Sequence, residues 1–231
     1  MLDEIATLKR AAAVRAVDYI QDGMKVGLGT GSTAEFAVRE LAQRVAHGLQ
    51  ITSVPTSEKI GDMARRLGMA PTTLEECPRL DVTIDGADEV DLTTFNVIKG
   101  RGGALLREKI VALATGREIL IVDETKVVKR LGEHAPVPVE VVQFGWTITQ
   151  SRLTELGCIP QRRIAEGGQA YTTDAGNYIL DCQFSGIDDP AAMATAIKQI
   201  TGVVEHGLFV DIARVVVEAH PQGTQVFSRE S

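Results

Sequence analysis

The sequence has few aromatic residues, few cysteines and no long apolar run, and each shortage argues against a class of protein. Aromatic residues make up 4% of the 231 positions, which is too few for a surface that stacks nucleic-acid bases. The three cysteines, Cys77, Cys158 and Cys182, are odd in number, far apart and in no CxxC arrangement. This pattern disfavours disulfides and a thiolate metal site. No apolar run approaches the length needed to cross a bilayer.

The chain also has fewer basic residues than acidic ones: 24 Lys and Arg against 31 Asp and Glu. The formal net charge is -7 and the calculated pI is about 5.2, whereas nucleic acids and anionic membranes attract basic proteins. The first residues, Met1 to Glu4, have neither the basic start nor the apolar run of a signal peptide. We therefore expect a cytoplasmic protein whose partner is a small molecule, not a nucleic acid or a membrane.

Strand and helix patterns alternate over the first part of the chain. This alternation predicts an α/β fold with a Rossmann-like, mostly parallel sheet and right-handed crossovers. The expected strands cover residues 25–29, 48–55, 81–85 and 118–122. The expected helices cover residues 5–20, 58–67 and 104–115, and a further helix carries Phe36, Val38 and Leu41.

The pattern changes after Pro136. Strands are expected at 137–142 and 158–164, a hairpin at 170–184 and a last strand at 203–210, with helices at 147–156 and after Pro190. This βαββαβ order is typical of a ferredoxin-like unit. We predict a smaller α+β domain over 133–206 and a Rossmann-like catalytic domain over 1–132 plus 207–231, with the apolar run at 215–217 returning to the first sheet.

A cluster of acids follows one of the expected inner strands. In Asp81 to Asp91, written DVTIDGADEVD, a short apolar strand ends in Asp85, Asp88 and further carboxylates. Open α/β sheets bind ligands outside the carboxyl ends of their strands, and neighbouring carboxylates can hold different protonation states and pass protons. The alternative is a solvated acidic turn in which Gly86 supplies the bend.

A glycine-rich turn follows the first expected strand. In GLGTGST, residues 27–33, the glycines let the backbone approach a ligand, and the N–H groups at the start of the next helix favour a phosphate. The loop lacks the Gly-Lys-Ser/Thr of a Walker A motif, and Val54 to Ser57 offers no acid for a dinucleotide ribose. A simple phosphate monoester is thus favoured over NAD, although a turn that merely caps a helix is the competing interpretation.

Two further segments carry charge after a strand or a glycine loop. Lys99 precedes the loop at 100–103, and Glu108 lies about one turn into the helix that follows. On that helix Leu106, Ile110 and Leu113 form the expected core stripe, which would leave Glu108 on another face and expose Arg107 and Lys109. Lys126 follows the strand at 118–122 and would point toward the same edge of the sheet.

Taken together, GLGTGSTA, DGADE, KGRGGALLREKI and VDETK occur in the order typical of the ribose-5-phosphate isomerase type A family, which the chain resembles nearly end to end. The resemblance implies interconversion of D-ribose 5-phosphate and D-ribulose 5-phosphate in the non-oxidative pentose phosphate pathway, without metal or organic cofactor. It also implies a homodimer or homotetramer. Arg101 departs from the all-glycine loop of some members and leaves the local loop shape open.

The resemblance and the chemistry of the reaction assign roles to these residues. Glu108 would be general base and then acid, Lys99 would stabilise the enediolate oxygen, and Asp85 with Asp88 would move hydroxyl protons and help open the ring. Lys9 is a further phosphate candidate by its similar place in the family. The residues expected to bind substrate are Thr30, Gly31, Ser32, Thr33, Asp85, Gly86, Ala87, Asp88, Lys99, Gly100, Arg101, Gly102 and Lys126.

Two alternative functions are compatible with parts of this pattern. A sugar-phosphate sensor on the same fold would need the phosphate loop and the acids but no base. A metal-dependent isomerase would use the acidic cluster as ligands, but DGADEVD lacks the acid spacing of a calcium loop, and none of the four histidines lies in a ligand-spaced pair. Glu108 with Lys99 in this context favours the cofactor-free enzyme.

Overall fold

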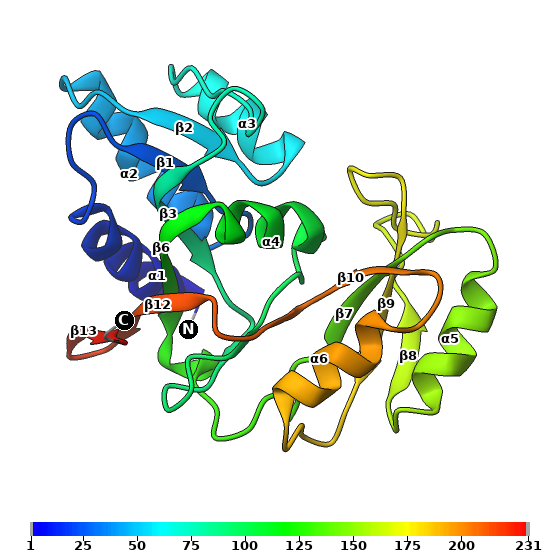
Figure 1. Ribbon diagram of the computed structural model, residues 1–231. Coiled ribbons are helices and arrows are strands. Elements are labelled where there is room, and N and C mark those ends of the chain that lie inside the picture. The colour runs from blue at the N-terminus through cyan, green and yellow to red at the C-terminus, as the bar shows by residue number, and fades with distance from the viewer. Residues whose placement is uncertain (1, 230–231) are drawn as a thin grey trace. The chain divides into compact units, whose positions relative to one another are not determined.

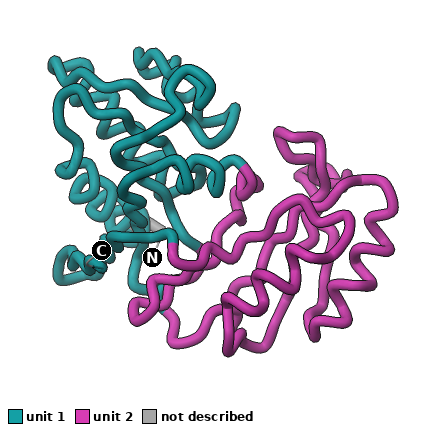
Figure 2. The backbone as a smooth tube through the Cα atoms, in the orientation of Figure 1, with its two compact units in different colours: residues 1–87, 107–127, 212–231 teal, residues 88–106, 128–211 magenta. Residues whose placement is uncertain are grey.

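The computed structural model describes residues 2–229, which fall into two compact units (Figure 2). Unit 1 comprises the residues up to 87, residues 107–127 and the residues from 212 onward, and unit 2 comprises 88–106 and 128–211. The sequence placed the boundaries at 132/133 and 206/207. The main difference is segment 88–106, which was assigned to the first domain and instead belongs to unit 2 because its short strands pair there.

Unit 1 is built on a six-stranded sheet with the order β13-β12-β6-β3-β1-β2 (Figure 1). Its strands are β1 (Lys25–Leu28), β2 (Thr52–Pro55), β3 (Leu80–Gly86), β6 (Thr115–Asp123), β12 (Ala213–His220) and β13 (Gly223–Ser228). Neighbouring strands are parallel except for β12 with β13. The predicted Rossmann-like sheet is confirmed, as is the return of residues 215–217 to it. In a sheet of this strand order, the switch point lies between β1 and β3.

Helices α1 (Leu2–Val17), α2 (Ala34–Ala46), α3 (Glu58–Arg66) and α4 (Leu105–Leu113) accompany this sheet, and a 3-10 turn, η1 (Glu124–Lys126), follows β6. The main core joins α1, α2 and α3 to alternate side chains of the inner strands, such as Leu28 and Ile84. A smaller cluster joins Val111 of α4 to Val54 and Leu80. None of the helices within residues 2–229 is long and apolar enough to cross a membrane.

The glycines of β1 are required by its neighbour β3. Gly27 pairs in register with Thr83, and a Cβ at position 27 would lie 2.9 Å from the Thr83 Cβ and closer still to its hydroxyl. Two residues on, a Cβ at Gly29 would lie 2.6 Å from the Asp85 Cα. Since alternate residues of a strand share one face, the Gly-Leu-Gly sequence opens that face of β1 for the side chains of β3.

Unit 2 contains a four-stranded antiparallel sheet in the order β10-β7-β9-β8. The chain order is β7 (Val137–Val141), α5 (Trp146–Thr154), β8 (Ile159–Arg162), β9 (Tyr178–Gln183), α6 (Pro190–Lys198) and β10 (Val203–His206). The predicted βαββαβ order of the smaller α+β part is therefore confirmed. Asp189 caps α6 by accepting hydrogen bonds from the N–H groups of Ala191 and Ala192 at 3.1 and 3.0 Å.

The expected hairpin at 170–184 is only partly correct. Regular pairing of its second strand begins at Tyr178, and before that Ala170 makes a single isolated bridge to Ile164. The turn forms where it was expected, since the N–H of Thr173 donates to the Asn177 carbonyl at 2.9 Å. Gly167 and Gly168, both with positive φ, form a tight turn between Ile164 and Ala170, ahead of the expected hairpin.

A three-stranded sheet completes unit 2. Its order is β11-β5-β4, with β4 (Glu89–Val90), β5 (Val97–Ile98) and β11 (Leu208–Phe209) all antiparallel. The N–H of Lys99, just after β5, donates to the Gly207 carbonyl at 2.9 Å. These strands hold both Asp88 and Lys99 in the framework of unit 2.

The close packing of β1 on β3 gives a first prediction. Gly27→Ala should lower the free energy of unfolding by about 1–3 kcal/mol, because the added methyl must displace the Thr83 side chain. Gly116→Ala, in β6 of the same sheet, is the matched control, since its Cβ would come no nearer than 3.4 Å to another atom. Urea unfolding followed by circular dichroism measures both. Equal midpoints for the two variants would contradict this account of the Gly-Leu-Gly sequence.

Candidate active site

The glycine-rich loop after β1 leads directly into α2. Gly31 has a φ of 122°, which a residue with a side chain rarely adopts, and its carbonyl accepts the N–H of Glu35 at 2.9 Å. Thr33 is the N-cap residue, with no side-chain capping bond. Ser32 is exposed and Thr33 is half-buried. The loop thus ends at the N-terminus of a helix, where N–H groups and the helix dipole favour an anion.

Lys9 of α1 reaches this loop. Its Nζ donates to the Ser32 hydroxyl at 2.8 Å, which brings a cation to the anion-favouring end of α2. The Thr30 hydroxyl turns the other way, into the protein. It is 2.7 Å from the Thr56 hydroxyl and donates to Ser57 at 2.8 Å, so Thr30 ties the loop to the end of β2 with its side chain.

Asp85 lies at the end of β3, across from the same loop. Its side chain is 1% exposed, and its Oδ1 accepts the N–H of Gly86 at 2.7 Å. The absent side chain of Gly29 makes room for this carboxylate. A Cβ at Gly86 would lie 3.8 Å from the Thr33 Cβ, so Gly86 borders the loop as well. Unit 1 therefore gathers the loop, Lys9 and Asp85 at the β1/β3 switch point, where doubly wound sheets bind their ligands.

The other acids of the DGADE segment have separate partners in unit 2. The Oδ2 of Asp88 accepts the N–H of Arg101 at 3.0 Å. Glu89 is 1% exposed, and its two oxygens accept the N–H groups of Gly132, His134 and Ala135 at 2.6, 2.7 and 2.6 Å. Within residues 2–229, no three His, Cys, Asp or Glu side chains are grouped as a metal site would require. Glu89 thus has a structural role in holding the 132–135 segment.

Lys99 is buried in unit 2, with 2% of its surface exposed. Its Nζ lies 5.6 Å from the ring centroid of Phe209, within the range of a cation–π interaction. The loop after Lys99 turns sharply at Gly100, whose φ is 103° and where a Cβ would lie 2.7 Å from that of Leu105. A buried ammonium beside a tight backbone turn is a fixed positive charge that can stabilise an oxyanion.

The expected core stripe of α4 is wrong. Ile110 and Leu113 are 48% and 70% exposed, whereas Glu108 is 2% exposed. The buried face is formed instead by Leu105, Glu108 and Ala112, which also follow helical spacing. Lys109, expected on the surface, is buried too. Glu108 therefore lies on the buried side of its helix and not on a solvated face.

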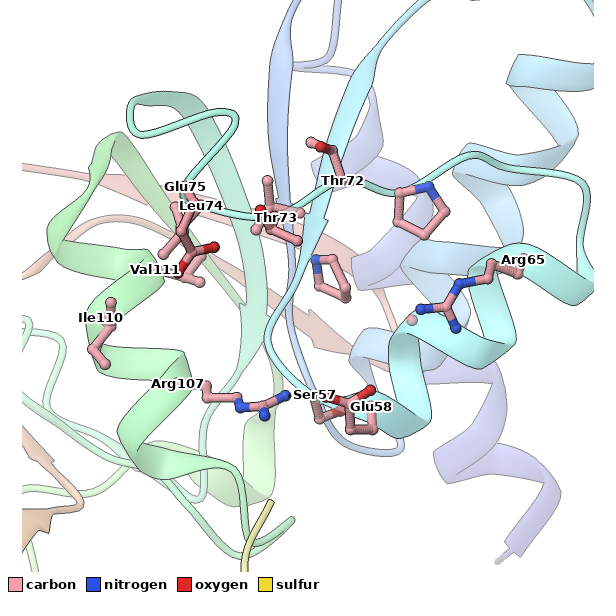
Figure 3. Close-up of a pocket in the computed structure, with 14 residues that line it drawn as sticks. Ser57, Glu58, Arg65, Thr72, Thr73, Leu74, Glu75, Arg107, Ile110 and Val111 are labelled. Carbon is pink, nitrogen blue, oxygen red and sulfur yellow. Dashed lines mark hydrogen bonds and ion pairs between the residues drawn. The ribbon is translucent and has the colours of Figure 1, made fainter. Parts of the chain in front are cut away.

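Arg107, Ile110 and Val111 of α4 line a pocket in unit 1 of about 440 Å³ (Figure 3). Ile110 and Val111 of α4 face residues of α3 and of the 71–75 loop across it. At its rim, the Arg107 Nη1 pairs with the Glu58 Oε1 at 2.8 Å. The Arg107 hydrogen bond lowers the pKa of the Glu58 carboxyl. Arg107 therefore lines this pocket, whereas the next residue, Glu108, is buried.

Lys126 ends the short turn η1 that follows β6. The preceding Asp123 caps this turn: its Oδ1 accepts the Thr125 N–H at 3.1 Å and also accepts the Thr125 hydroxyl. Lys126 is half-buried, and the cap fixes the backbone from which it extends. Its place after an inner parallel strand agrees with the sequence prediction.

Comparison with known proteins identifies relatives along nearly the whole chain. The family model for ribose 5-phosphate isomerase A (phosphoriboisomerase A) matches residues 52–223. The chain belongs to this family. Ribose-5-phosphate isomerase A of Gloeobacter violaceus is 53% identical over 225 residues, covering 97% of each chain. The enzyme of Gluconobacter oxydans is 50% identical over 218 residues, covering 94% of each.

Solved structures of the ribose-5-phosphate isomerase A family share this fold. The isomerase of Methanocaldococcus jannaschii has a TM-score of 0.92 at 37% identity, covering 96% of this chain and 99% of the other. A ribose-5-phosphate isomerase in complex with phospho-erythronic acid has a TM-score of 0.94 at 36% identity, covering 97% and 99%. The resemblance found in the sequence is confirmed, as is the prediction that the protein is an isomerase.

Several residues that hold these segments in place were not found from the sequence. Glu89 was grouped with the functional acids, although its oxygens hold a backbone segment. Arg163 and Asp181 were not considered, yet the Arg163 Nη1 donates to the carbonyls of Gly100 and Arg101 at 3.0 Å each. No local pattern could reveal these residues, because their partners lie 18 to 63 positions away in the chain.

The three hydrogen bonds of Glu89 give a second prediction for this family member. Glu89→Gln should lower the free energy of unfolding by roughly 2–4 kcal/mol, because its amide N–H₂ would face a backbone N–H and the buried charge is lost. Glu133→Gln, in the same segment and with a partly exposed carboxylate 3.6 Å from Arg130, is the control. It should change stability by less than about 1 kcal/mol. Urea denaturation of both variants tests the difference, and a stable Glu89→Gln protein would refute the anchoring role.

Proposed function

We propose that this protein interconverts D-ribose 5-phosphate and D-ribulose 5-phosphate by direct proton transfer through Glu108. The observation that carries this proposal is the buried carboxylate of Glu108, on the helix that follows Lys99 and its glycine loop within the family's KGRGGALLREKI segment. A carboxylate with 2% exposure is costly to bury, and such a cost is expected where a group has a catalytic use.

The reaction needs a base, an oxyanion partner and a group for hydroxyl protons. Glu108 removes the C2 proton of the aldose and returns a proton to C1, since one carboxylate can serve both carbons. Lys99 and the N–H groups of the adjoining loop stabilise the enediolate oxygen. Asp85 and Asp88 exchange the hydroxyl protons and assist ring opening.

The phosphate is assigned to the loop after β1. The N-terminus of α2, the Ser32 and Thr33 hydroxyls, Lys9 and Lys126 supply donors and positive charge. Thr30 contributes through its backbone, because its hydroxyl is bonded to Thr56 and Ser57. Holding the phosphate away from the reacting carbons orients the sugar and reduces the entropy that the reaction must overcome.

We also propose that the enzyme is cytoplasmic and works as a homodimer or homotetramer. Several large apolar side chains support self-association because they are exposed in the single chain. Phe144 is 95% exposed and Ile148 is 69% exposed in unit 2, and Leu113 is 70% exposed in unit 1. Phe144 and Ile148 line one cavity of unit 2, and exposed apolar side chains that gather in one area are typical of protein interfaces.

The assignment of the base gives a third prediction. Glu108→Gln keeps the size of the side chain but cannot accept the C2 proton, so kcat for ribose 5-phosphate should fall by about 10²-fold or more. KM should change little. In D₂O the wild-type enzyme should place deuterium on the sugar carbon during turnover, whereas the variant should catalyse neither isomerisation nor exchange at C2.

Arg107→Gln is the matched control for Glu108→Gln. It removes a charge from the neighbouring position of α4 and disrupts the exposed pair with Glu58, so kcat should stay within about two-fold of wild type. The urea midpoint of each variant verifies folding. If Glu108→Gln keeps a near wild-type kcat, Glu108 is not the general base, and the base must be Asp85 or Asp88.

The assignment of the phosphate gives a fourth prediction. Lys126→Ala should raise both the KM for ribose 5-phosphate and the inhibition constant of inorganic phosphate by roughly 10-fold or more, because a charged hydrogen bond is lost. Lys129→Ala, three positions on and exposed, should change neither constant. A Lys126→Ala enzyme that binds phosphate as tightly as wild type would remove Lys126 from the phosphate site.

A further inference from the structure

One arginine in unit 2 connects the βαββαβ sheet to the loop that follows Lys99. Arg163 comes directly after β8, and its Nη1 donates to two successive carbonyls, those of Gly100 and Arg101, at 3.0 Å each. The side chain is 14% exposed. A single guanidinium nitrogen thus fixes two adjacent peptide groups of the glycine loop.

The guanidinium is itself held by two further side chains, Asp181 and Tyr171. Asp181 of β9 accepts its Nε at 2.9 Å and its Nη2 at 2.5 Å, a two-point ion pair. The guanidinium carbon lies 5.8 Å from the centre of the Tyr171 ring. The Arg163 backbone is also fixed, since its N–H donates to the Ile179 carbonyl at 2.9 Å and its carbonyl accepts from Tyr171 at 3.0 Å. A two-point arginine–carboxylate pair has a defined geometry, which a lysine cannot reproduce.

Tyr171 restrains the same loop by packing. A Cβ added at Gly103 would lie 2.5 Å from the Cζ of Tyr171 and nearer still to its hydroxyl. Gly103 has a φ of 82°, and its N–H donates to the Gly100 carbonyl at 3.0 Å. The loop is therefore held at its start by Arg163 and at its end by Tyr171.

The two carbonyl contacts determine where the loop's N–H groups point. In a trans peptide the C=O and the following N–H point in opposite directions. Since the carbonyls of Gly100 and Arg101 face Arg163, the N–H groups of Arg101 and Gly102 face away from it. The N–H of Arg101 accordingly donates to the Oδ2 of Asp88 at 3.0 Å. Arg163 thereby orients both a donor of the loop and one of the acids assigned to the reaction.

We propose that Arg163, held by Asp181 and Tyr171, is a positioning residue for the isomerase reaction: it fixes the peptide groups after Lys99 so that their N–H groups, Lys99 and Asp88 keep the orientation that the enediolate requires. The Asp181 carboxylate balances the Arg163 charge. Arg163 therefore contributes by orienting the loop and not by long-range attraction of the substrate. This proposal deepens the function assigned above and rests on it.

Steady-state kinetics with ribose 5-phosphate test the proposal on the full-length enzyme. Arg163→Gln and Arg163→Lys should both lower kcat by about 10-fold or more, because small displacements of catalytic groups are costly, while KM changes less than about three-fold. Asp181→Asn should also lower kcat, by a smaller factor. In Arg163→Ala, millimolar guanidinium should restore part of the lost kcat and leave wild type unchanged, a response that a defect in stability alone would not show.

Arg162→Gln is the matched control. Arg162 is the preceding residue, and its guanidinium lies over the rings of Trp146 and Tyr178, at 4.6 and 5.3 Å from their centres. It should keep wild-type kcat and KM. If Arg163→Ala does not fold, Arg163→Lys and Asp181→Asn decide the question.

Three results would overturn the proposal: wild-type kcat in the Arg163→Lys and Arg163→Gln enzymes, an equal loss of kcat in Arg162→Gln, or a folded Arg163→Ala that guanidinium does not restore. Wild-type turnover is measured in the same assay. A wild-type enzyme that does not isomerise ribose 5-phosphate would contradict the proposed function itself, whereas an active wild type with equally active Arg163 variants would contradict only the positioning role.

Discussion

The contact between β1 and β3 is the constraint on which the site in unit 1 depends. Thr83 and Asp85 occupy space that side chains at Gly27 and Gly29 would fill, so the two strands can approach only with glycine at both positions. The same approach brings the end of β3 beside the loop that leads into α2. The glycine-rich sequence therefore serves two purposes at once: it lets Asp85 be buried, and it forms the backbone turn that favours a phosphate.

Unit 2 orients its charged groups mainly through the backbone. Glu89 accepts three N–H groups, Asp88 accepts one, and Arg163 donates to two carbonyls. Because buried charges are stable only with nearby donors or acceptors, these contacts couple the Lys99 loop to the β-sheet of the unit. The acids of a single short segment thus have different backbone partners, although their side chains are chemically alike.

The sequence predicted the features that depend on a local pattern. It did not predict the features that depend on contacts between residues far apart in the chain. Alternating strands and helices, glycine turns and the start of α6 at Pro190 are local, and the structure agrees with them. On α4, apolar spacing favoured Leu106, Ile110 and Leu113, but a face containing Glu108 is buried instead. Hydrophobicity alone cannot identify a carboxylate that is buried. The partners of Glu89 and Arg163 lie too far along the chain to be read from any motif.

Each unit is built from separate segments of the chain, and this limits how far it can fold during synthesis on the ribosome. The sheet of unit 1 lacks its fifth parallel strand until β12, residues 213–220, has been made, and β12 pairs along most of the length of β6. Unit 2 cannot place Glu89 before residues 132–135 exist. Contacts between distant segments form slowly because a long loop must close first. Neither unit can therefore finish folding while its own early segments alone are available, and one edge of β6 stays unpaired until β12 has been made.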